Sequence, residues 1–376
     1  MRVTDRQHTQ TLLTAVQNVR QGIFDRQEQI SSGKRVNRPS DDPAAAERIS
    51  QFKNSLQTTD RRLFSVNEGI GRLTLSESTF VTAGNAIQRG RELAIQARND
   101  TNSDVERANI GKEVNQLFQS LSGLANTQLN GRSIFAGHET QRDPYILGSV
   151  TTSLGANNAG TGTVVSAVVS TAAALEPDLY EIQYNGTNFD VLNLTTGETE
   201  VSGGGSPLTF DGLTVTLGGA PSAGDVFYAR TGYLYQGDSN DVSVEIGDGK
   251  TVSSNVAGNR VFSGPTVDLF TVFQDFHQAL ATNDVNGIES AIATLDTALS
   301  QVNNARADVG ARVNRLDTVK ESLSLVHVTI DTLRSDYEDA DLAEVATELS
   351  TLQVNLQASL SVLTRQFETS LLNFLR

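Results

Sequence analysis

The chain has 376 residues, enough for two or more domains, so core size does not limit its stability. Its net charge of −15 disfavours binding to nucleic acid or to an anionic membrane surface, because both attract Lys and Arg. The absence of Cys excludes disulfides, thiolate metal sites and a cysteine nucleophile. We therefore expect no nucleic-acid partner and no membrane partner.

The amino terminus, MRVTDRQHTQTLL, lacks the apolar stretch of a cleaved secretory signal. No apolar run in the chain is long enough to span a membrane. These rules alone suggest a cytoplasmic protein. An export route that reads an uncleaved amino terminus would leave no such mark in the sequence.

The first 30 residues predict an amphipathic helix. Its apolar stripe comprises Leu12, Val16, Val19, Ile23 and Ile30. Gly33 can end this helix, and Pro39 disfavours helical dihedrals at the residue before it. A second helix is expected from Pro43, which fits a first helical turn, with Asp41 or Asp42 as its cap.

Apolar residues then recur at three- and four-residue steps from Ile49 to Ala94. Such a repeat over about 55 residues predicts a rod like a coiled-coil helix, far longer than ordinary globular helices. The segment 99–104 breaks it, and a shorter helix is expected from Ile110 to Leu124. Asn130-Gly131 predicts a tight turn.

Residues 133–265 change character, because Gly, Thr, Ser and Asn dominate and no helical stripe is present. Leu208 and Phe210, the turn Asp211-Gly212, and the alternation from Leu213 to Leu217 predict a β-hairpin. We expect an all-β insertion.

Helix returns at Val267, and a second long stripe extends from Ile288 to Leu333. Two rods of similar length on either side of one insertion most simply pack antiparallel. If Arg98 lies level with about Asn286, Glu77 falls nearly opposite Arg306. We therefore predict an ion pair between Glu77 and Arg306 that helps to fix the register.

The last helix has an apolar stripe without Gly or Pro. The stripe residues that we expect to bind other subunits or partners are Leu349, Leu352, Leu356, Leu360, Leu363, Phe367, Leu371 and Phe374. A bare stripe of this kind needs a packing partner. The amino-terminal stripe is the best candidate, from the same chain or from neighbouring copies, and we favour burial between copies.

The predicted fold is α+β, with long antiparallel helical rods built from both chain ends and an all-β domain inserted between them. We expect three domains. Residues 1–40 and 336–376 form terminal helices for assembly, residues 41–140 and 265–335 form the rod domain with a β-hairpin, and residues 141–264 form the inserted β domain.

Several motifs in this order resemble the bacterial flagellin superfamily. The stretch ISSGKRVNRPSDDPAAAERI is similar to the signature that follows the first helix of that superfamily. Its RPSDDP portion is more similar to the hook–filament junction branch, the FlgL or third hook-associated proteins, than to filament flagellin. FSVNEGIGRLTLSES, RELAIQARNDTNS, LNGRSIFAG and the terminal LLNFLR also match in style. The resemblance covers roughly residues 1–140 and 265–376.

The resemblance implies a coiled-coil-rich structural protein of motility. It would be secreted through the flagellar type III export apparatus without a cleaved signal peptide and located extracellularly in the bacterial flagellum. Its implied role is an adaptor joining the first hook-associated protein to flagellin, with other copies of itself in a ring. An export chaperone would hold the carboxyl-terminal helix. Filament-forming flagellin is the first alternative, and a cytoplasmic coiled-coil scaffold is another.

The loop after the first helix carries Lys34, Arg35, Arg38, Asp41 and Asp42, and the resemblance places it between two assembly layers. Its cations can form ion pairs with a neighbouring subunit or can simply be solvated, and the sequence leaves both open.

Sequence signals for chemistry are weak, and we expect neither an enzyme nor a cofactor. His138-Glu139 begins a zinc-protease motif, but Arg142 stands where the second imidazole ligand is required. This disfavours a metalloprotease-bearing flagellin relative, which is the third alternative. IGDGKTV lacks the first glycine of a phosphate-binding loop, so a hairpin turn is expected there.

Overall fold

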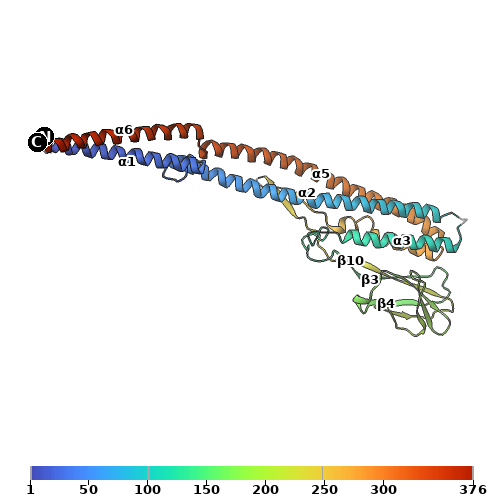
Figure 1. Cartoon of the computed structure of the whole chain (residues 1–376). Coiled ribbons are helices and arrows are strands. Elements are labelled where there is room, and N and C mark those ends of the chain that lie inside the picture. Colours follow the sequence, from blue (N-terminus) through green and yellow to red (C-terminus); the bar gives the residue numbers. More distant parts are fainter. Residues whose placement is uncertain (1, 100–101, 248, 375–376) are drawn as a thin grey trace. The chain divides into compact units, whose positions relative to one another are not determined.

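The computed structural model describes residues 2–99, 102–247 and 249–374, and the side chains of residues 2–6, 8, 9 and 366–374 lie outside this description. It divides into two compact units. Unit 1 comprises Met1–Phe64 and Glu321–Arg376, and unit 2 comprises Ser65–Lys320. The predicted α+β class is confirmed, because the structure has long helices from both chain ends and antiparallel β-sheets from the sequence segment that separates them (Figure 1). The three domain boundaries expected from the sequence stay a prediction.

The described residues of unit 1 form four helical segments. They are α1 (Arg2–Ser32), the beginning of α2 (Pro43–Ala97), the end of α5 (Val285–Glu338) and α6 (Leu342–Phe374). Gly33, at φ +70°, ends α1, because a residue without Cβ adopts this left-handed conformation at little cost. Asp42 caps α2 by accepting a hydrogen bond from the backbone N–H of Ala45 at 3.0 Å. Both of these boundaries agree with the sequence prediction.

The helical part of unit 2 contains the remainder of α2 and α5 with α3 (Asp104–Ala125) and α4 (Leu269–Ala281). Ser103 and Glu106 form a capping box at the start of α3. The long segments of α2 and α5 run antiparallel, with Arg98 Nη1 3.6 Å from Glu289 Oε1. Arg306 Nε lies 3.6 Å from Glu77 Oε1, so the predicted register pair is formed.

A break between α4 and α5 was absent from the sequence prediction, which treated the region after Val267 as one helical stretch. Asn283 adopts φ +57° there, and Asp284 accepts a hydrogen bond from the backbone N–H of Asn286 at 3.1 Å. The side-chain amide of Asn283 also donates to Asp104 at 2.6 Å. This tertiary contact stabilises a left-handed residue that local sequence does not reveal.

The two larger sheets described in the β insertion are antiparallel. The five-stranded sheet has the order β3 (Tyr145–Leu154), β10 (Val226–Tyr235), β5 (Leu179–Tyr184), β6 (Phe189–Asn193) and β7 (Thr199–Gly204). The three-stranded sheet has the order β4 (Thr163–Val169), β9 (Leu213–Gly218) and β8 (Leu208–Phe210). Asp211 and Gly212 both have positive φ, as the predicted two-residue turn requires. Alternate side chains of the two sheets bury a shared core that includes Tyr180, Val191 and Phe227.

Two short hairpins complete unit 2. One pairs β1 (Gln128–Leu129) with β2 (Arg132–Ser133) across the Asn130-Gly131 turn. The other pairs β11 (Ser243–Gly247) with β12 (Lys250–Ser253), where the phosphate-loop-like segment lies. Since a strand follows this turn, no helix amino terminus is present there to bind a phosphate.

An aromatic cluster forms much of the core of the helical part of unit 2. Phe80 stacks on Phe135 with ring centroids 5.4 Å apart, and Phe262 lies edge-on to Phe135 at 5.2 Å. Tyr145, at the start of β3, packs against Phe270 of α4 at 5.0 Å. These contacts join the first β strand of the insertion to the helices.

Candidate functional site: the terminal helix pair and its joint

The two terminal helices pack against each other within one chain. Val16 of α1 and Leu363 of α6 are both buried, and Leu352 Cδ1 would lie 3.3 Å from a Cβ added at Gly22. Arg26 Nε is 2.7 Å from Glu348 Oε2. Residue 22 lies level with residue 352 and residue 26 with residue 348, so α1 and α6 run antiparallel (Figure 1).

The predicted partner-binding stripes therefore form much of the seam of this intrachain pair. Leu12, Val19, Ile23, Leu349, Leu352 and Leu356 are half-buried, Val16 and Leu363 are buried, and Leu360 is exposed. The side chains of Phe367, Leu371 and Phe374 lie outside the described residues. Burial of these stripes between copies stays a prediction.

A second set of apolar side chains on the terminal helices faces solvent. On α1, Leu13 is 47% exposed and Phe24 is 54% exposed. On α6, Val354 is 61% exposed and Val362 is 51% exposed. Sequence reasoning missed this set, because it followed only the densest stripe of each helix.

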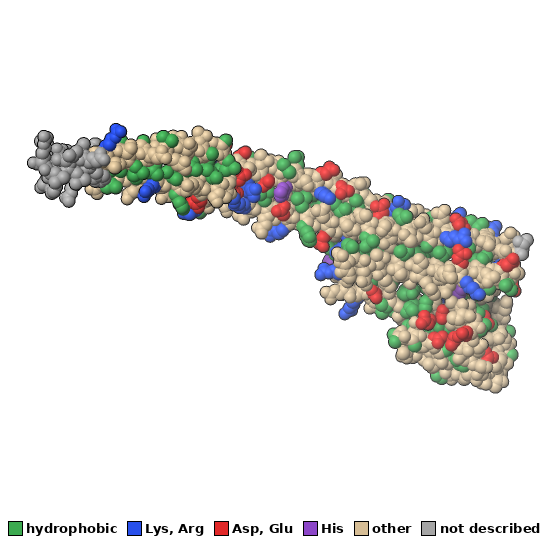
Figure 2. All heavy atoms as spheres, in the orientation of Figure 1, with side chains coloured by type: hydrophobic (Ala, Val, Ile, Leu, Met, Phe, Trp, Pro, Cys, Tyr) green, Lys and Arg blue, Asp and Glu red, His purple; other side chains and the backbone are tan. Residues whose placement is uncertain are grey.

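Exposed apolar surface is concentrated in unit 1. Among the described residues, twelve of the twenty large hydrophobic side chains that are exposed belong to it. They are Leu13, Phe24, Ile30, Phe64, Leu325, Val326, Val328, Leu333, Leu342, Val354, Leu360 and Val362. Figure 2 shows hydrophobic side chains along the surface of the terminal helices. Large exposed apolar patches on soluble proteins mark interaction surfaces.

Two helix boundaries meet at one place in unit 1, which we call the joint. It comprises residues 33–42 between α1 and α2, and residues 337–341, which are the last two residues of α5 and the segment before α6. The backbone N–H of Arg35 donates to the carbonyl of Glu338 at 2.7 Å, and that of Ala340 donates to the carbonyl of Gly33 at 3.0 Å. Lys34 and Asp339 form an antiparallel β-bridge. Backbone N–H and carbonyl groups of each segment are thus hydrogen-bonded to those of the other.

A buried carboxylate lies at the centre of the joint. The side chain of Glu338 is only 4% exposed, and its Oε1 is 2.6 Å from Lys34 Nζ and 2.9 Å from Lys53 Nζ. Burial alone would raise the pKa of Glu338, but the hydrogen bonds from Lys34 and Lys53 outweigh it and hold the pKa below its usual value. Arg334 Nε also lies 3.6 Å from Glu338 Oε2, so Glu338 is an ionised group with three cationic partners. Sequence reasoning did not select it.

Tyr337 adds an aromatic contact to the joint. Its hydroxyl accepts a hydrogen bond from Arg48 Nη1 at 2.6 Å, and the Arg48 guanidinium lies 5.3 Å from the ring centroid. Its carbonyl accepts from Arg35 Nη2 at 2.9 Å. The end of α5 is therefore bound to both the loop and the first turns of α2.

The loop charges selected from sequence all have partners within the chain. Arg35 pairs with Asp42 at 3.2 Å, and Arg38 pairs with Glu28 at 3.0 Å. Asp41 Oδ2 accepts hydrogen bonds from the backbone N–H groups of Asn37 and Arg38. The hydrogen bond from Ala45 and the neighbouring Arg35 lower the pKa of Asp42. This intrachain pairing was not among the alternatives expected from the sequence, and ion pairing of the loop with a neighbouring subunit stays a prediction.

The zinc-motif candidate lies in a turn. The backbone N–H of His138 donates to Asp238 at 2.9 Å, and its imidazole Nε2 lies 3.2 Å from the carbonyl of Asp241. No group of three or more His, Asp or Glu side chains among the described residues is arranged to hold a metal ion. Of the helices described, none has the length and apolar content of a membrane span.

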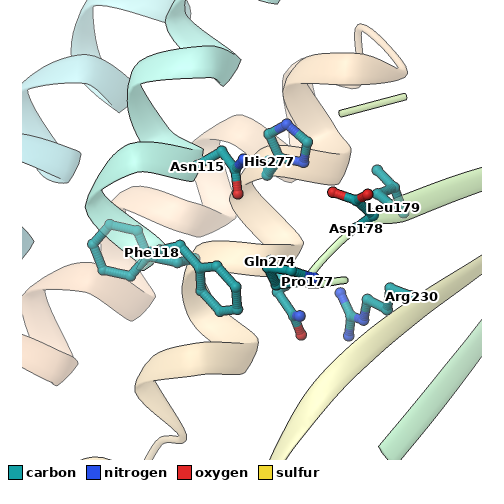
Figure 3. A pocket seen from close by; sticks show the side chains of 9 residues that line it. Asn115, Phe118, Pro177, Asp178, Leu179, Arg230, Gln274 and His277 are labelled. Atoms are coloured by element: carbon teal, nitrogen blue, oxygen red, sulfur yellow. The ribbon is translucent and has the colours of Figure 1, made fainter. Parts of the chain in front are cut away.

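A small cavity lies among α3, α4 and the five-stranded sheet. Its volume is about 10 Å³, close to the least that can hold a single water. Asn115, Asp178, Arg230, Gln274 and His277 provide its polar lining, with Asp178 on the sheet side and His277 on α4 (Figure 3). Burial lowers the pKa of His277 to about 4 and raises the pKa of Asp178. The space suits packing between the sheet and the helices more than binding of an organic substrate.

Two protein-family models match the two ends of the chain. Residues 3–140 match the bacterial flagellin N-terminal helical region, and residues 292–375 match the bacterial flagellin C-terminal helical region. Together these regions cover more than half of the chain. The chain belongs to the bacterial flagellin family. Residues 154–231, within the β insertion, match the D2-like domain of flagellar hook-associated protein 1.

Relatives by sequence include flagellins. Flagellin D of Vibrio cholerae is 25% identical over 367 residues, which cover 94% of this chain and 92% of the relative. Flagellin B of Vibrio anguillarum is 26% identical over 362 residues, covering 92% and 91% of the two chains. Both alignments therefore cover nearly the whole of the relative and nearly the whole of this flagellin-family chain.

A solved structure supports the fold. A putative flagellar hook-associated protein from Vibrio parahaemolyticus aligns with a TM-score of 0.52 at 14% identity, covering 80% of this chain and 100% of the other. FlgL of Xanthomonas campestris aligns with a TM-score of 0.42 at 21% identity, covering 76% and 99%. As a flagellin-family member, the chain is a structural protein of the flagellum.

Proposed function

We propose that this flagellin-family chain is a structural adaptor at the hook–filament junction of the bacterial flagellum. It would join the first hook-associated protein to flagellin and form a ring with other copies of itself through its terminal helices. The observation that carries this proposal is the match of residues 154–231 to a domain of hook-associated protein 1, between flagellin-type chain ends.

The distribution of exposed apolar side chains supports a role in assembly and not in catalysis. Unit 1 holds most of the exposed large apolar side chains of the described residues, and the outward residues Leu325 and Val328 of α5 add to those of the terminal helices. Burial of such surface against neighbours would contribute roughly 25 cal/mol per Å². The proposed role is therefore structural, without an enzymatic activity or a cofactor.

The proposed location is extracellular, in the flagellum, after export without a cleaved signal peptide. The proposed partner before export is a chaperone that holds the carboxyl-terminal helix. An unfolded chain gains from the absence of Cys during such export, because no disulfide can form prematurely.

A second candidate function is filament-forming flagellin, favoured by the similarity to Vibrio flagellins along nearly the whole chain. Deletion of the gene separates the two functions. If the chain is the adaptor, cells should keep their hooks and release unassembled flagellin into the medium. If the chain is the main filament subunit, the medium of the deletion strain should contain no flagellin in excess of the parent, and expression of another flagellin should restore filaments.

A further inference from the structure

Three Asn-Gly pairs occur in the chain, at residues 130–131, 185–186 and 286–287. An asparagine followed by glycine is chemically prone to deamidation, because glycine has no Cβ to hinder attack of its backbone nitrogen on the asparagine side chain. All three asparagines are exposed, so exposure does not distinguish them. They differ in the hydrogen bonds of the side chain, in the space around the glycine and in the stability of the local backbone.

Asn130, in the turn between β1 and β2, has the least constrained side chain of the three. Its carboxamide forms no hydrogen bond with any other residue that the structure describes. A Cβ added at Gly131 would meet no heavy atom within 4 Å apart from its chain neighbours, so the turn is open to water. Asn130 and Gly131 have φ of +53° and +73°, as a tight two-residue turn requires.

Asn185, between β5 and β6, is held by its own side chain. Its Oδ1 accepts hydrogen bonds from the backbone N–H groups of Thr187 at 3.1 Å and Asn188 at 2.9 Å. Its Nδ2 donates to Asp190 Oδ2 at 3.2 Å. Attack on this carboxamide by the next backbone nitrogen would first have to break these bonds.

Asn286 is protected by the helix that contains it. It lies in the first turn of α5, whose regular dihedrals hold the next backbone nitrogen away from the side chain. The surroundings of Gly287 are crowded, because an added Cβ would lie 2.6 Å from Asp284 Oδ2 and 2.8 Å from Ala279 Cβ. Little room is left there for a ring between residues 286 and 287.

The backbone around Asn130 is also the easiest of the three to open. Only two residue pairs join β1 to β2, whereas five join β5 to β6 and α5 has 54 residues. Short hairpins open locally at a low free energy, and such opening gives a side chain and the next backbone nitrogen access to each other. The structure therefore ranks Asn130 first among the three asparagines.

We propose that Asn130 is a site of spontaneous modification, at which the ageing chain deamidates and forms isoaspartate. The Gly131 nitrogen attacks Asn130 Cγ and forms a C–N bond, and the Cγ–Nδ2 bond breaks. Nδ2 leaves as ammonia with the proton that the Gly131 nitrogen loses. One water then hydrolyses either C–N bond of the resulting succinimide, which yields aspartate or isoaspartate. The net reaction consumes one water, releases one ammonia and involves no oxidant or reductant.

Isoaspartate would change the turn itself. It adds one carbon to the main chain between residues 130 and 131, so a two-residue turn can no longer keep Leu129 paired with Arg132. The loosening should stay local, because the buried ring of Phe135 is packed against Phe80 and Phe262. This inference is independent of the proposed function, since it depends only on the turn and on water.

Peptide mapping by mass spectrometry tests the proposal on the full-length folded chain. The chain is incubated in mildly alkaline buffer and digested under mildly acidic conditions, and fragmentation by electron transfer then distinguishes isoaspartate from aspartate. Asn130 should deamidate at least about tenfold faster than Asn185 and Asn286. In concentrated urea the three pairs should react at similar rates, because only the shared Asn-Gly chemistry remains. Equal rates in the folded chain, or an unmodified Asn130 in the folded chain that reacts readily in urea, would overturn the proposal.

Two matched substitutions assign the modification to its residue. Asn130→Gln should remove most of the isoaspartate that an isoaspartyl methyltransferase labels in the aged chain, since attack on the longer side chain must close a larger ring. Asn185→Gln is the control and should leave the labelling unchanged. If the control lost as much label as Asn130→Gln, the proposed site would be wrong. Circular dichroism of both variants checks that each keeps the parent fold.

Hydrogen exchange followed by mass spectrometry tests the consequence for the hairpin. Peptides that span residues 128–133 should exchange faster in the aged chain than in the fresh chain, because isoaspartate weakens the pairing of β1 with β2. Peptides from β5 and β6 should exchange equally in both. Unchanged exchange of residues 128–133 in chains that contain isoaspartate would contradict the predicted loosening.

Discussion

At the residue scale, the joint depends on one buried carboxylate. Glu338 accepts from Lys34 and Lys53 and lies where two distant chain segments meet. Its pKa is lowered in the folded chain, so the unfolded state takes up a proton first as the pH falls. The stability that Glu338 contributes is therefore complete above its unfolded pKa of about 4.3 and is lost as the pH falls through the folded pKa.

Glu338→Gln should lower the free energy of unfolding of unit 1 by about 1–3 kcal/mol at neutral pH, because it removes the charge that two ammonium groups surround. Thermal unfolding followed by circular dichroism measures this change. Glu348→Gln is the control, since Glu348 also pairs with a cation but is about half exposed, and it should cost less than about 1 kcal/mol. If both variants lost the same free energy of unfolding, Glu338 would contribute no more than an exposed ion pair.

His277 gives unit 2 a separate pH dependence. Burial lowers its pKa to about 4, while an unfolded chain binds the proton near 6.5. The neutral imidazole therefore contributes full stability above about pH 6.5, and this contribution falls between about pH 6.5 and pH 4 by up to about 3 kcal/mol. Asp178 and Arg230 lie around the same cavity (Figure 3).

Replacement His277→Gln keeps a polar side chain and removes this titration. We expect the free energy of unfolding, measured in urea at pH 7, 5.5 and 4.5, to fall less steeply with decreasing pH in the variant than in the parent chain. His327→Gln is the control, because His327 lies in unit 1 near Asp60. Identical slopes for the parent and His277→Gln in unit 2 would show that another group titrates there.

At the scale of elements, the two rods are held in register by contacts that follow from their repeat. Glu77 and Arg306 are half-exposed and 3.6 Å apart, so the pair should have a coupling energy of about 0.2–1 kcal/mol. A double-mutant cycle with Glu77→Gln and Arg306→Gln measures it, and the value should decrease at high salt. Zero coupling at low salt would mean that the apolar seam alone fixes the register.

The sequence predicted the elements whose signals are local. Gly33 and Pro43 mark helix boundaries, and the three- and four-residue repeat predicts both rods, because each depends on nearby residues only. The break at Asn283 depends on Asp104 and Arg107 of another helix, which are far away in the sequence. The pairing order of the two sheets likewise depends on nonlocal contacts that strand patterns do not specify.

The candidate assembly surface was predictable only in part. The seam residue Val16 follows from periodicity, but the structure places it against α6 of the same chain. The exposed apolar side chains Leu13 and Phe24 of α1 are too few to produce a second stripe in sequence. Glu338 was also missed, since its importance comes from Lys34 and Lys53, which lie about 300 residues before it in the chain.

At the scale of the whole molecule, the chain joins flagellin-type ends to an insertion of the hook-associated type. The ends contain the exposed apolar side chains that assembly would bury. The insertion has its own apolar core, which allows it to vary independently of the helices. This combination accounts for similarity both to flagellins and to hook-associated proteins.

Immunogold electron microscopy of detached flagella, with antibodies raised against the β insertion, tests the central claim most directly. The proposed adaptor function predicts gold label confined to one short zone between the hook and the filament. Label along the whole filament would identify the chain as a filament subunit, and flagella without label would contradict a structural role in the assembled organelle.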